Sequence, residues 1–270
     1  MHSIEEKLAA FERLLKIMVE LREQCPWDRK QTFETLRHLT IEETYELSEA
    51  IMDSDLDEIR KETGDLLLHM VFYAQIASET SREQGGWDIA DSLNGICDKL
   101  VARHPHIYGD VEAKDEETVK ANWERLKLKE GKKSVLEGVP KGLPSLVKAY
   151  RIQDKVRGVG FDWENAGQVW DKVQEELTEF QAEVDIDSER ATDEFGDVLF
   201  ALVNYARFKN INPDEALERT NRRFQARFQH MEAAIQADAS EGGKAMADMS
   251  LSELDAYWDR AKSAISNDHA

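Results

Sequence analysis

The 270-residue chain lacks long apolar runs and is poor in cysteine. No run of roughly 18 apolar residues occurs, which predicts that the chain has no membrane-spanning helix. The N-terminal residues lack the basic region and apolar core of a secretory signal, so we expect none. Cys25 and Cys97 are the only cysteines, and no metal-binding spacing relates them. They predict two reduced thiols in a cytoplasmic protein.

Basic residues are also scarce, because 35 lysines and arginines stand against 55 aspartates and glutamates, for a formal net charge of −20. Nucleic-acid polymers and anionic membranes are bound through basic surfaces, so neither is an expected partner. A small polyanion would need local basic groups, or a metal ion that bridges it to the protein.

No segment alternates apolar and polar residues as a half-buried strand does, and no glycine-rich phosphate-binding loop is present. The sequence "GKKS" at 131–134 lacks the earlier glycine of that loop and follows no strand. Almost every long segment instead places its apolar residues at helical spacing. These patterns predict an all-α fold without a sheet.

The chain has only five prolines, and two of them, Pro140 and Pro144, lie in a segment that also contains glycines. This segment predicts a linker at 131–147, between an N-terminal module at 1–130 and a C-terminal module at 148–270. Pro213 stands where a helix would begin, a position that tolerates proline.

The two predicted modules resemble each other. "IEETYELSEAI" matches "QEELTEFQAEV", and "KETGDLLLHMVFYAQ" matches "DEFGDVLFALVNYAR". Two basic residues four apart and a tryptophan follow in each module: Lys99, Arg103 and Trp123 in the first, Arg223, Arg227 and Trp258 in the second. The offset stays at roughly 130 residues, which indicates a duplication. Each half predicts a small helical bundle whose core is completed by the other half or by a second subunit.

Each module carries two pairs of acidic residues, spaced three residues apart, on two successive helices. They are Glu43, Glu46, Glu62 and Asp65 in the first module and Glu176, Glu179, Glu194 and Asp197 in the second. This spacing puts each pair on one helix face, so packing of the two helices would bring four carboxylates together. Two like charges about 4 Å apart repel by about 4 kcal/mol at an effective dielectric near 20. The acids therefore bind cations or remain solvated. Internal salt bridges are not expected, because neither stripe shows a lysine or arginine at matching spacing.

Carboxylates without histidine or cysteine favour a hard cation, Mg²⁺ first and Mn²⁺ as a substitute. A di-iron bundle would need Glu-x-x-His motifs. His69 follows Asp65 by four residues and its counterpart is Ala201, so we expect His69 to be a packed or surface residue. Gly64 and Gly196 lie inside the helices, where glycine costs about 1 kcal/mol relative to alanine. Close helix packing is the expected reason for both.

The acidic motifs, together with "CPWD", "RHPH" and the late tryptophan, resemble the MazG nucleoside triphosphate pyrophosphohydrolases. The resemblance extends over nearly the whole chain, including the tandem arrangement. It implies two all-α MazG-like modules, Mg²⁺ dependence, a homodimer, and hydrolysis of nucleoside triphosphates to the monophosphate and pyrophosphate. It also implies a role in nucleotide-pool cleaning and a link to bacterial stress responses.

Carried onto this sequence, the resemblance makes the four acids of the second module metal ligands, and the first module has the same complete set. The resemblance also implies that Glu175 orients or deprotonates the attacking water. The implied substrate-binding residues are Lys172, Arg223, Arg227, Trp258 and Asn204. The two arginines could equally pair with surface acids, and the tryptophan and asparagine could equally be packing residues.

The first module departs from this pattern at two positions. Phe72 stands where the second module has Asn204, and Pro105 would end a helix soon after Arg103. These differences predict that the first module is structural, regulatory or weakly active. A nucleotide- or Mg²⁺-sensing protein with little turnover is the alternative function, since a sensor needs the metal ligands but not Glu175. A helical scaffold with solvated acids fits less well, because the basic residues and tryptophans are repeated too.

Overall fold

The computed structural model describes residues 1–109, 134–186 and 189–265. The described residues form helices joined by turns and short loops, and no strand occurs among them. The prediction of an all-α fold is therefore confirmed. Within the same residues, no helix combines the length and apolarity needed to cross a membrane. Trp123 and positions 131–133 of the predicted linker lie outside the described residues.

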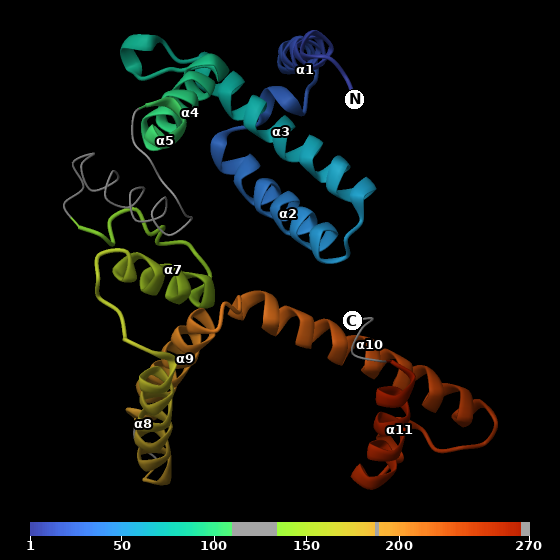
Figure 1. Cartoon of the computed structure of the whole chain (residues 1–270). Coiled ribbons are helices and arrows are strands. Elements are labelled where there is room, and N and C mark those ends of the chain that lie inside the picture. The colour runs from blue at the N-terminus through green and yellow to red at the C-terminus, as the bar shows by residue number, and fades with distance from the viewer. Residues whose placement is uncertain (110–133, 187–188, 266–270) are drawn as a thin grey trace. The chain divides into compact units, whose positions relative to one another are not determined.

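The chain separates into two compact units, Met1–Ala113 and Lys114–Ala270 (Figure 1). The described part of the predicted linker consists mainly of turns, and the first described helix of the second unit begins at Ser145. The module boundaries taken from the sequence stay a prediction.

The described residues of the first unit, 1–109, form five α-helices and two short 3₁₀ turns. They are α1 (Ile4–Gln24), η1 (Asp28–Lys30), α2 (Phe33–Met52), α3 (Leu56–Ser78), η2 (Arg82–Gln84), α4 (Ile89–Arg103) and α5 (Pro105–Tyr108). Side chains that accept hydrogen bonds from first-turn backbone amides cap the two helices that carry acidic pairs: Thr32 for α2 and Asp55 for α3. These caps fix where each helix starts.

The core of the first unit joins α1, α2 and α3. Met18, Leu36, Val71 and Phe72 are buried together. Arg22 of α1 forms an ion pair with Glu79, with Nε 2.6 Å from Oε1. Its guanidinium also donates hydrogen bonds to the backbone oxygens of Asp28 and Gln31. These contacts connect the end of α1 with η1 and with the end of α3.

The second unit contains α7 (Ser145–Arg157), α8 (Ala166–Asp185), α9 (Ala191–Phe208), α10 (Pro213–Ser240), η3 (Met246–Asp248) and α11 (Leu251–Ala264). Pro213 occupies the first turn of α10 behind the capping side chain of Asn212, as its position in the sequence predicts. Helices α8 and α9 pack along each other, and α7 packs on α9.

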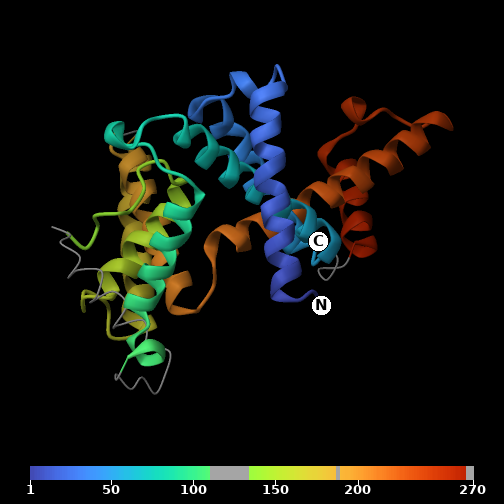
Figure 2. The same cartoon turned by 90° about the horizontal axis from the view of Figure 1, so that it is seen from above.

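Helices α10 and α11 form a second hairpin within this unit. Met231, Ile235 and Ala261 are its buried residues. Helix α10 leads away from the α8–α9 pair, and α11 folds back against it (Figures 1 and 2). The acidic helices and the helix that carries Arg223 and Arg227 therefore belong to different hairpins of one unit.

The two modules end their basic helices differently, as the sequence predicts. Helix α4 stops at Arg103, two residues before Pro105, whereas α10 continues beyond Arg227 to Ser240. Proline has no amide hydrogen and clashes with the preceding turn, so it cannot extend α4. The first module consequently has no long basic helix equivalent to α10 among the described residues.

Candidate active site

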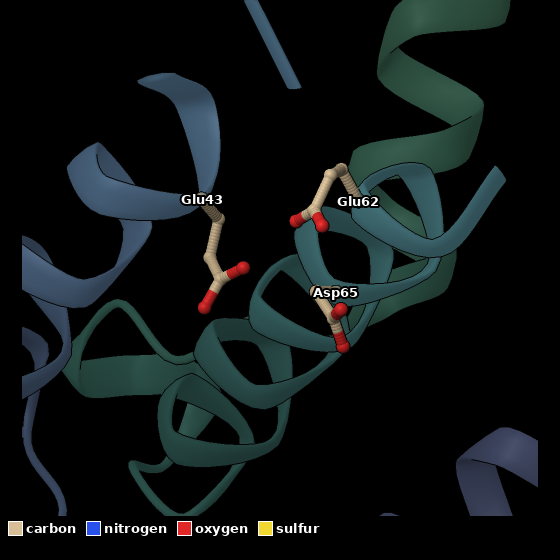
Figure 3. Close-up of side chains that lie close together, drawn as sticks. All are labelled: Glu43, Glu62 and Asp65. Carbon is tan, nitrogen blue, oxygen red and sulfur yellow. The ribbon is translucent and has the colours of Figure 1, made fainter. Parts of the chain in front are cut away.

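Three carboxylates meet between α2 and α3 of the first module. One oxygen each from Glu43, Glu62 and Asp65 lies within 4.8 Å of the others. Figure 3 shows Glu43 on one helix across from Glu62 and Asp65 on the other. Glu43 belongs to α2, and the other two lie one helical turn apart on α3. The antiparallel packing of two acidic helix faces thus produces the cluster that the spacing predicts.

The second module repeats this arrangement. Glu176 of α8 and the α9 residues Glu194 and Asp197 again offer three oxygens within 4.8 Å of one another. Glu176 and Glu194 are buried, whereas Asp197 is exposed. We call the groups the first cluster (Glu43, Glu62, Asp65) and the second cluster (Glu176, Glu194, Asp197).

Glu46 and Glu179 do not join the clusters, although the sequence places them in the same sets. Both side chains are exposed. A three-residue step turns a side chain about 60° around the helix. On α3 and α9 both acids of a pair still reach the cluster, whereas on α2 and α8 the second acid of the pair is exposed to solvent. Glu46 still acts through its charge, because it helps to raise the pKa of Glu62. A ligand role for these two acids stays a prediction.

The first cluster holds negative charge that no described basic side chain neutralises. Burial raises the pKa of Glu43, and the charges of Asp65 and Glu46 raise it further. Burial also raises the pKa of Glu62, followed by the charges of Glu46 and Asp65. Glu62 Oε2 is buried without a hydrogen-bond partner. Such an oxygen is destabilising unless something binds it.

The second cluster contains its own counter-ions. Lys172 Nζ lies 2.6 Å from Glu176 Oε1 and 2.6 Å from Glu175 Oε1, and these hydrogen bonds raise the pKa of Lys172. Arg190 Nη2 lies 2.8 Å from Glu194 Oε1. The expectation that no lysine or arginine has matching spacing was therefore wrong. Both cations precede their acids by four residues, the spacing at which helical side chains meet.

The chemistry of both clusters fits a divalent cation. All the donors are carboxylate oxygens, the ligands that Mg²⁺ and Mn²⁺ prefer. The three oxygens of the first cluster are close enough to share one ion, and a bound cation would satisfy the orphaned Glu62 Oε2. The residues present therefore suit the predicted Mg²⁺.

The glycines beside the clusters are not explained by close packing. A Cβ atom built on Gly64 or on Gly196 would meet no atom within 4 Å, apart from the helix's own backbone. The expectation of a close helix approach was therefore wrong for the described chain. Both positions are exposed, next to Asp65 and Asp197.

His69 is a packed residue, as expected. Its side chain is buried, with Nδ1 3.0 Å from Thr40 Oγ1, which in turn lies 2.6 Å from the hydroxyl of Tyr73. Burial lowers the pKa of His69, which favours the neutral ring. His69 is not in the first cluster, so it gives no support to a di-iron site.

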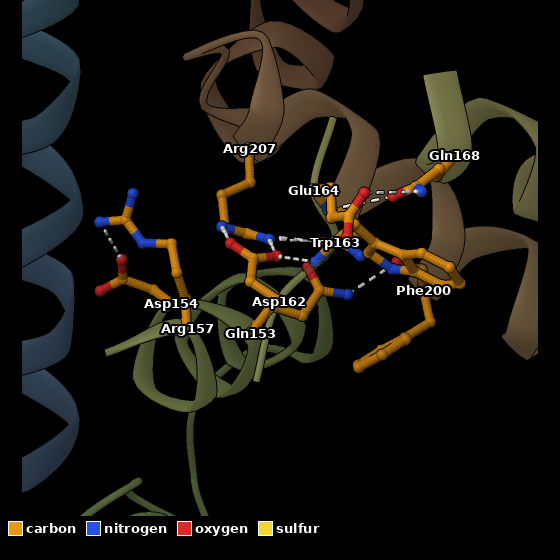
Figure 4. Close-up of polar contacts among 10 residues, drawn as sticks. Gln153, Asp154, Arg157, Asp162, Trp163, Glu164, Gln168, Phe200 and Arg207 are labelled. Atoms are coloured by element: carbon orange, nitrogen blue, oxygen red, sulfur yellow. Dashed lines mark hydrogen bonds and ion pairs between the residues drawn. The ribbon is translucent and has the colours of Figure 1, made fainter. Parts of the chain in front are cut away.

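Arg207 is the centre of a buried polar network (Figure 4). Asn204 joins this network through hydrogen bonds. The Asn204 Oδ1 accepts hydrogen bonds from Arg207 Nε and Nη2, at 3.1 and 2.8 Å. Arg207 also binds both carboxylate oxygens of Asp162, at 2.5 and 2.9 Å. Gln153 of α7 lies beside this pair and donates to the Phe200 carbonyl oxygen at 2.8 Å. The network ties the loop before α8 to α9, and a substrate contact by Asn204 stays a prediction.

The other predicted substrate-binding residues lie on the α10–α11 hairpin. Trp258 packs on Phe224 with ring centroids 5.1 Å apart. Arg223 donates to Thr220 Oγ1, and Arg227 reaches the Ile265 carbonyl oxygen. No described interaction links these residues to the second cluster.

Arg190 and Arg207 are not among the site residues predicted from the sequence. The pairing of Arg190 with Glu194 could have been predicted, since Arg190 precedes Glu194 by four residues. The pairing of Arg207 could not have been predicted from local spacing, because its partner Asp162 lies 45 residues earlier in the chain.

Comparison with known proteins agrees with this arrangement. Residues 31–108 match the model of the MazG nucleotide pyrophosphohydrolase domain. The chain is 40% identical over 261 residues to a nucleoside triphosphate pyrophosphohydrolase of Escherichia coli (strain K12), covering 93% of this chain and 96% of the relative. It is 41% identical over 257 residues to the nucleoside triphosphate pyrophosphohydrolase/pyrophosphatase MazG of Thermotoga maritima, covering 93% and 95%. Similarity at this level spans both units and includes both acidic clusters within its range. The chain is all-α in its described residues and belongs to the MazG family of nucleoside triphosphate pyrophosphohydrolases.

Proposed function

We propose that the chain hydrolyses nucleoside triphosphates to the monophosphate and pyrophosphate in a Mg²⁺-dependent reaction, with the second cluster as the principal active site. One observation carries the choice of module: buried carboxylates and basic side chains occur together there. A triphosphate brings several negative charges, so its site needs cations besides the metal. The first cluster offers carboxylates without a described basic partner.

The domain match lies on residues 31–108, in the first module. It therefore does not favour the second module, and the choice between modules rests on the basic groups. We propose that the first module has a structural or regulatory role or a low activity.

Each residue of the second module has a proposed role. Glu176, Glu194 and Asp197 would hold Mg²⁺, with Glu179 completing the set from the exposed side of α8. The bound ion would neutralise phosphate charge and make a water molecule more acidic. Glu175, which is exposed beside the cluster, would orient that water and accept its proton. Lys172 would contact the phosphates.

The α10–α11 residues would complete the site through a homodimer. Arg223 and Arg227 would bind phosphate, and Trp258 would lie near the base, in the site of a second copy. Exposed apolar side chains at equivalent positions of α3 and α9 support such an assembly: Leu67, Met70, Leu199 and Leu202, each 40–43% exposed. Light scattering on the purified chain should give the mass of a dimer. The mass of a monomer under assay conditions would contradict this arrangement.

A product assay tests the proposed reaction. ATP, dTTP and GTP are each incubated with the protein, with and without Mg²⁺, and products are identified by phosphorus NMR. We expect monophosphate and pyrophosphate in equal amounts, only when metal is present. Turnover with all three bases would fit the proposed role in nucleotide-pool cleaning and stress responses.

The alternative function, a nucleotide or Mg²⁺ sensor, makes the opposite prediction for the same assay. A sensor would bind nucleotide in calorimetry but release no products. Release of inorganic phosphate together with a nucleoside diphosphate would contradict both the proposed hydrolase and the sensor. Those products would place the cleavage at the terminal phosphate.

A further inference from the structure

The two clusters differ in how their negative charge is compensated. In the second cluster, Lys172 and Arg190 each lie within 2.8 Å of a buried carboxylate oxygen. No described lysine or arginine contacts the acids of the first cluster. The two sites therefore have the same set of oxygen donors but different net charges before any ligand binds.

One part of the difference in charge between the clusters comes from the residue four positions before the cluster acid on α8 and on α2. Lys172 precedes Glu176 by four residues on α8, whereas Leu39 precedes Glu43 by four residues on α2. Side chains four residues apart on a helix face each other. An ammonium group therefore reaches the second cluster from its own helix, and at the equivalent position of the first module an apolar side chain packs into the core.

The other part of the difference in charge comes from the residue four positions before the earlier cluster acid on α9 and on α3. Arg190, the N-cap residue of α9, precedes Glu194 by four residues, whereas Glu58 precedes Glu62 by four residues. The second module thus has a positive charge where the first has a negative one. Two independent positions change the charge around the clusters in the same direction.

Both cations are able to leave the carboxylates without unfolding the helices. Lys172 is 36% exposed and Arg190 is 70% exposed, while the Glu176 and Glu194 side chains that they contact are each 9% exposed. The cations thus cover buried acids from the solvent side. Their departure requires rotation of flexible side chains and, for Arg190, also the loss of its ion pair with Glu183 at 3.4 Å. Triphosphate oxygens offer both cations new negatively charged partners.

We infer that Lys172 and Arg190 are exchangeable counter-ions that compete with divalent metal for the second cluster and transfer to substrate phosphates when metal and triphosphate bind together. This inference rests on the proposed function of that cluster. Metal alone binds the second cluster more weakly than the first, and a triphosphate raises the metal affinity of the second cluster. By linkage, metal raises the triphosphate affinity by the same factor.

Binding of Mn²⁺ to the metal-free full-length chain tests the inference. Free Mn²⁺ is measured by electron paramagnetic resonance, with Glu43→Gln used to isolate the second cluster and Glu176→Gln to isolate the first. The second ligand is α,β-methylene-ATP, whose α–β bridge resists the proposed cleavage, and Mn²⁺ bound by this analogue alone is subtracted. We expect the analogue to raise Mn²⁺ affinity of the second cluster by roughly 5- to 150-fold, the usual range of coupling between sites.

Substitutions at the two equivalent positions assign this effect to residues. Lys172→Met should tighten Mn²⁺ binding without the analogue and reduce the enhancement that the analogue gives. Leu39→Lys should weaken Mn²⁺ binding at the first cluster. Lys262→Met removes an exposed lysine that pairs with Asp259 at 3.0 Å, and it should change neither quantity.

The possible failures are distinguishable. If Lys172→Met leaves Mn²⁺ affinity unchanged or weakens it, the counter-ion exchange is wrong while the metal site stands. If Mn²⁺ binds neither cluster, the proposed metal role fails as well. Circular dichroism of each variant shows whether it is folded, and the Leu39→Lys result is independent of any defect at position 172.

Discussion

Glu176→Gln is expected to lower kcat for nucleoside triphosphate hydrolysis by roughly a thousandfold, equivalent to about 4 kcal/mol of lost transition-state stabilisation. Glu176 is the buried α8 member of the second cluster. The amide keeps the shape of the side chain but removes the charge through which it would hold a cation. Initial rates of pyrophosphate release, measured over a range of Mg²⁺ concentrations, report the loss.

The matched control for this experiment is Glu43→Gln, at the equivalent position of the first cluster. Its kcat should fall by less than about tenfold, because the proposed site lies in the second module. An equal loss in the two variants would show that the first cluster is also required. Wild-type activity of Glu176→Gln would remove the second cluster from the reaction altogether.

Arg207→Leu is expected to lower the free energy of unfolding of the second unit by about 3 kcal/mol, since it leaves a paired carboxylate without its partner. The Arg207 side chain is 6% exposed and that of Asp162 is 20% exposed. The change also removes the hydrogen bonds to Asn204 and the packing of the guanidinium over the Phe208 ring at 4.7 Å. Urea unfolding followed by circular dichroism measures the effect.

Arg60→Leu provides the comparison for Arg207→Leu. Arg60 pairs with Asp57 at 2.7 Å, but the two side chains are 69% and 65% exposed. An exposed ion pair of this kind contributes about 0–1 kcal/mol, so stability should hardly change. If Arg207→Leu has an equally small effect, the buried network does not hold the loop before α8 against α9.

The helices and their acidic faces were predictable because they depend on local sequence. Apolar spacing, Pro213 at a helix start and the proline after Arg103 act within a few residues, and each appears in the structure as predicted. The repeat also allowed one module to check the other. Glu46 shows where such reasoning ends, because spacing puts an acid near a face but does not fix whether it meets the partner helix.

The basic residues that pair with the clusters could be predicted from the sequence only in part. The link between Arg190 and Glu194 follows from four-residue spacing and could have been recognised in the sequence. The packing of Asn204 with Arg207 and Asp162 could not, because it depends on a loop and a helix that are distant in the chain. At Gly64 and Gly196 a local rule gave a wrong prediction. It predicted close helix packing, but the structure leaves open space where a Cβ atom would lie at both positions.

The sequence by itself determined the all-α class and the duplicated acidic helices, since these follow from periodicity, and the chemistry of the side chains predicted a hard cation. The tertiary structure alone decided which acids meet and where Arg207 binds. These features depend on how helices from different parts of the chain cross and on which side chains that crossing buries. Local spacing constrains the crossing, but only packing selects it.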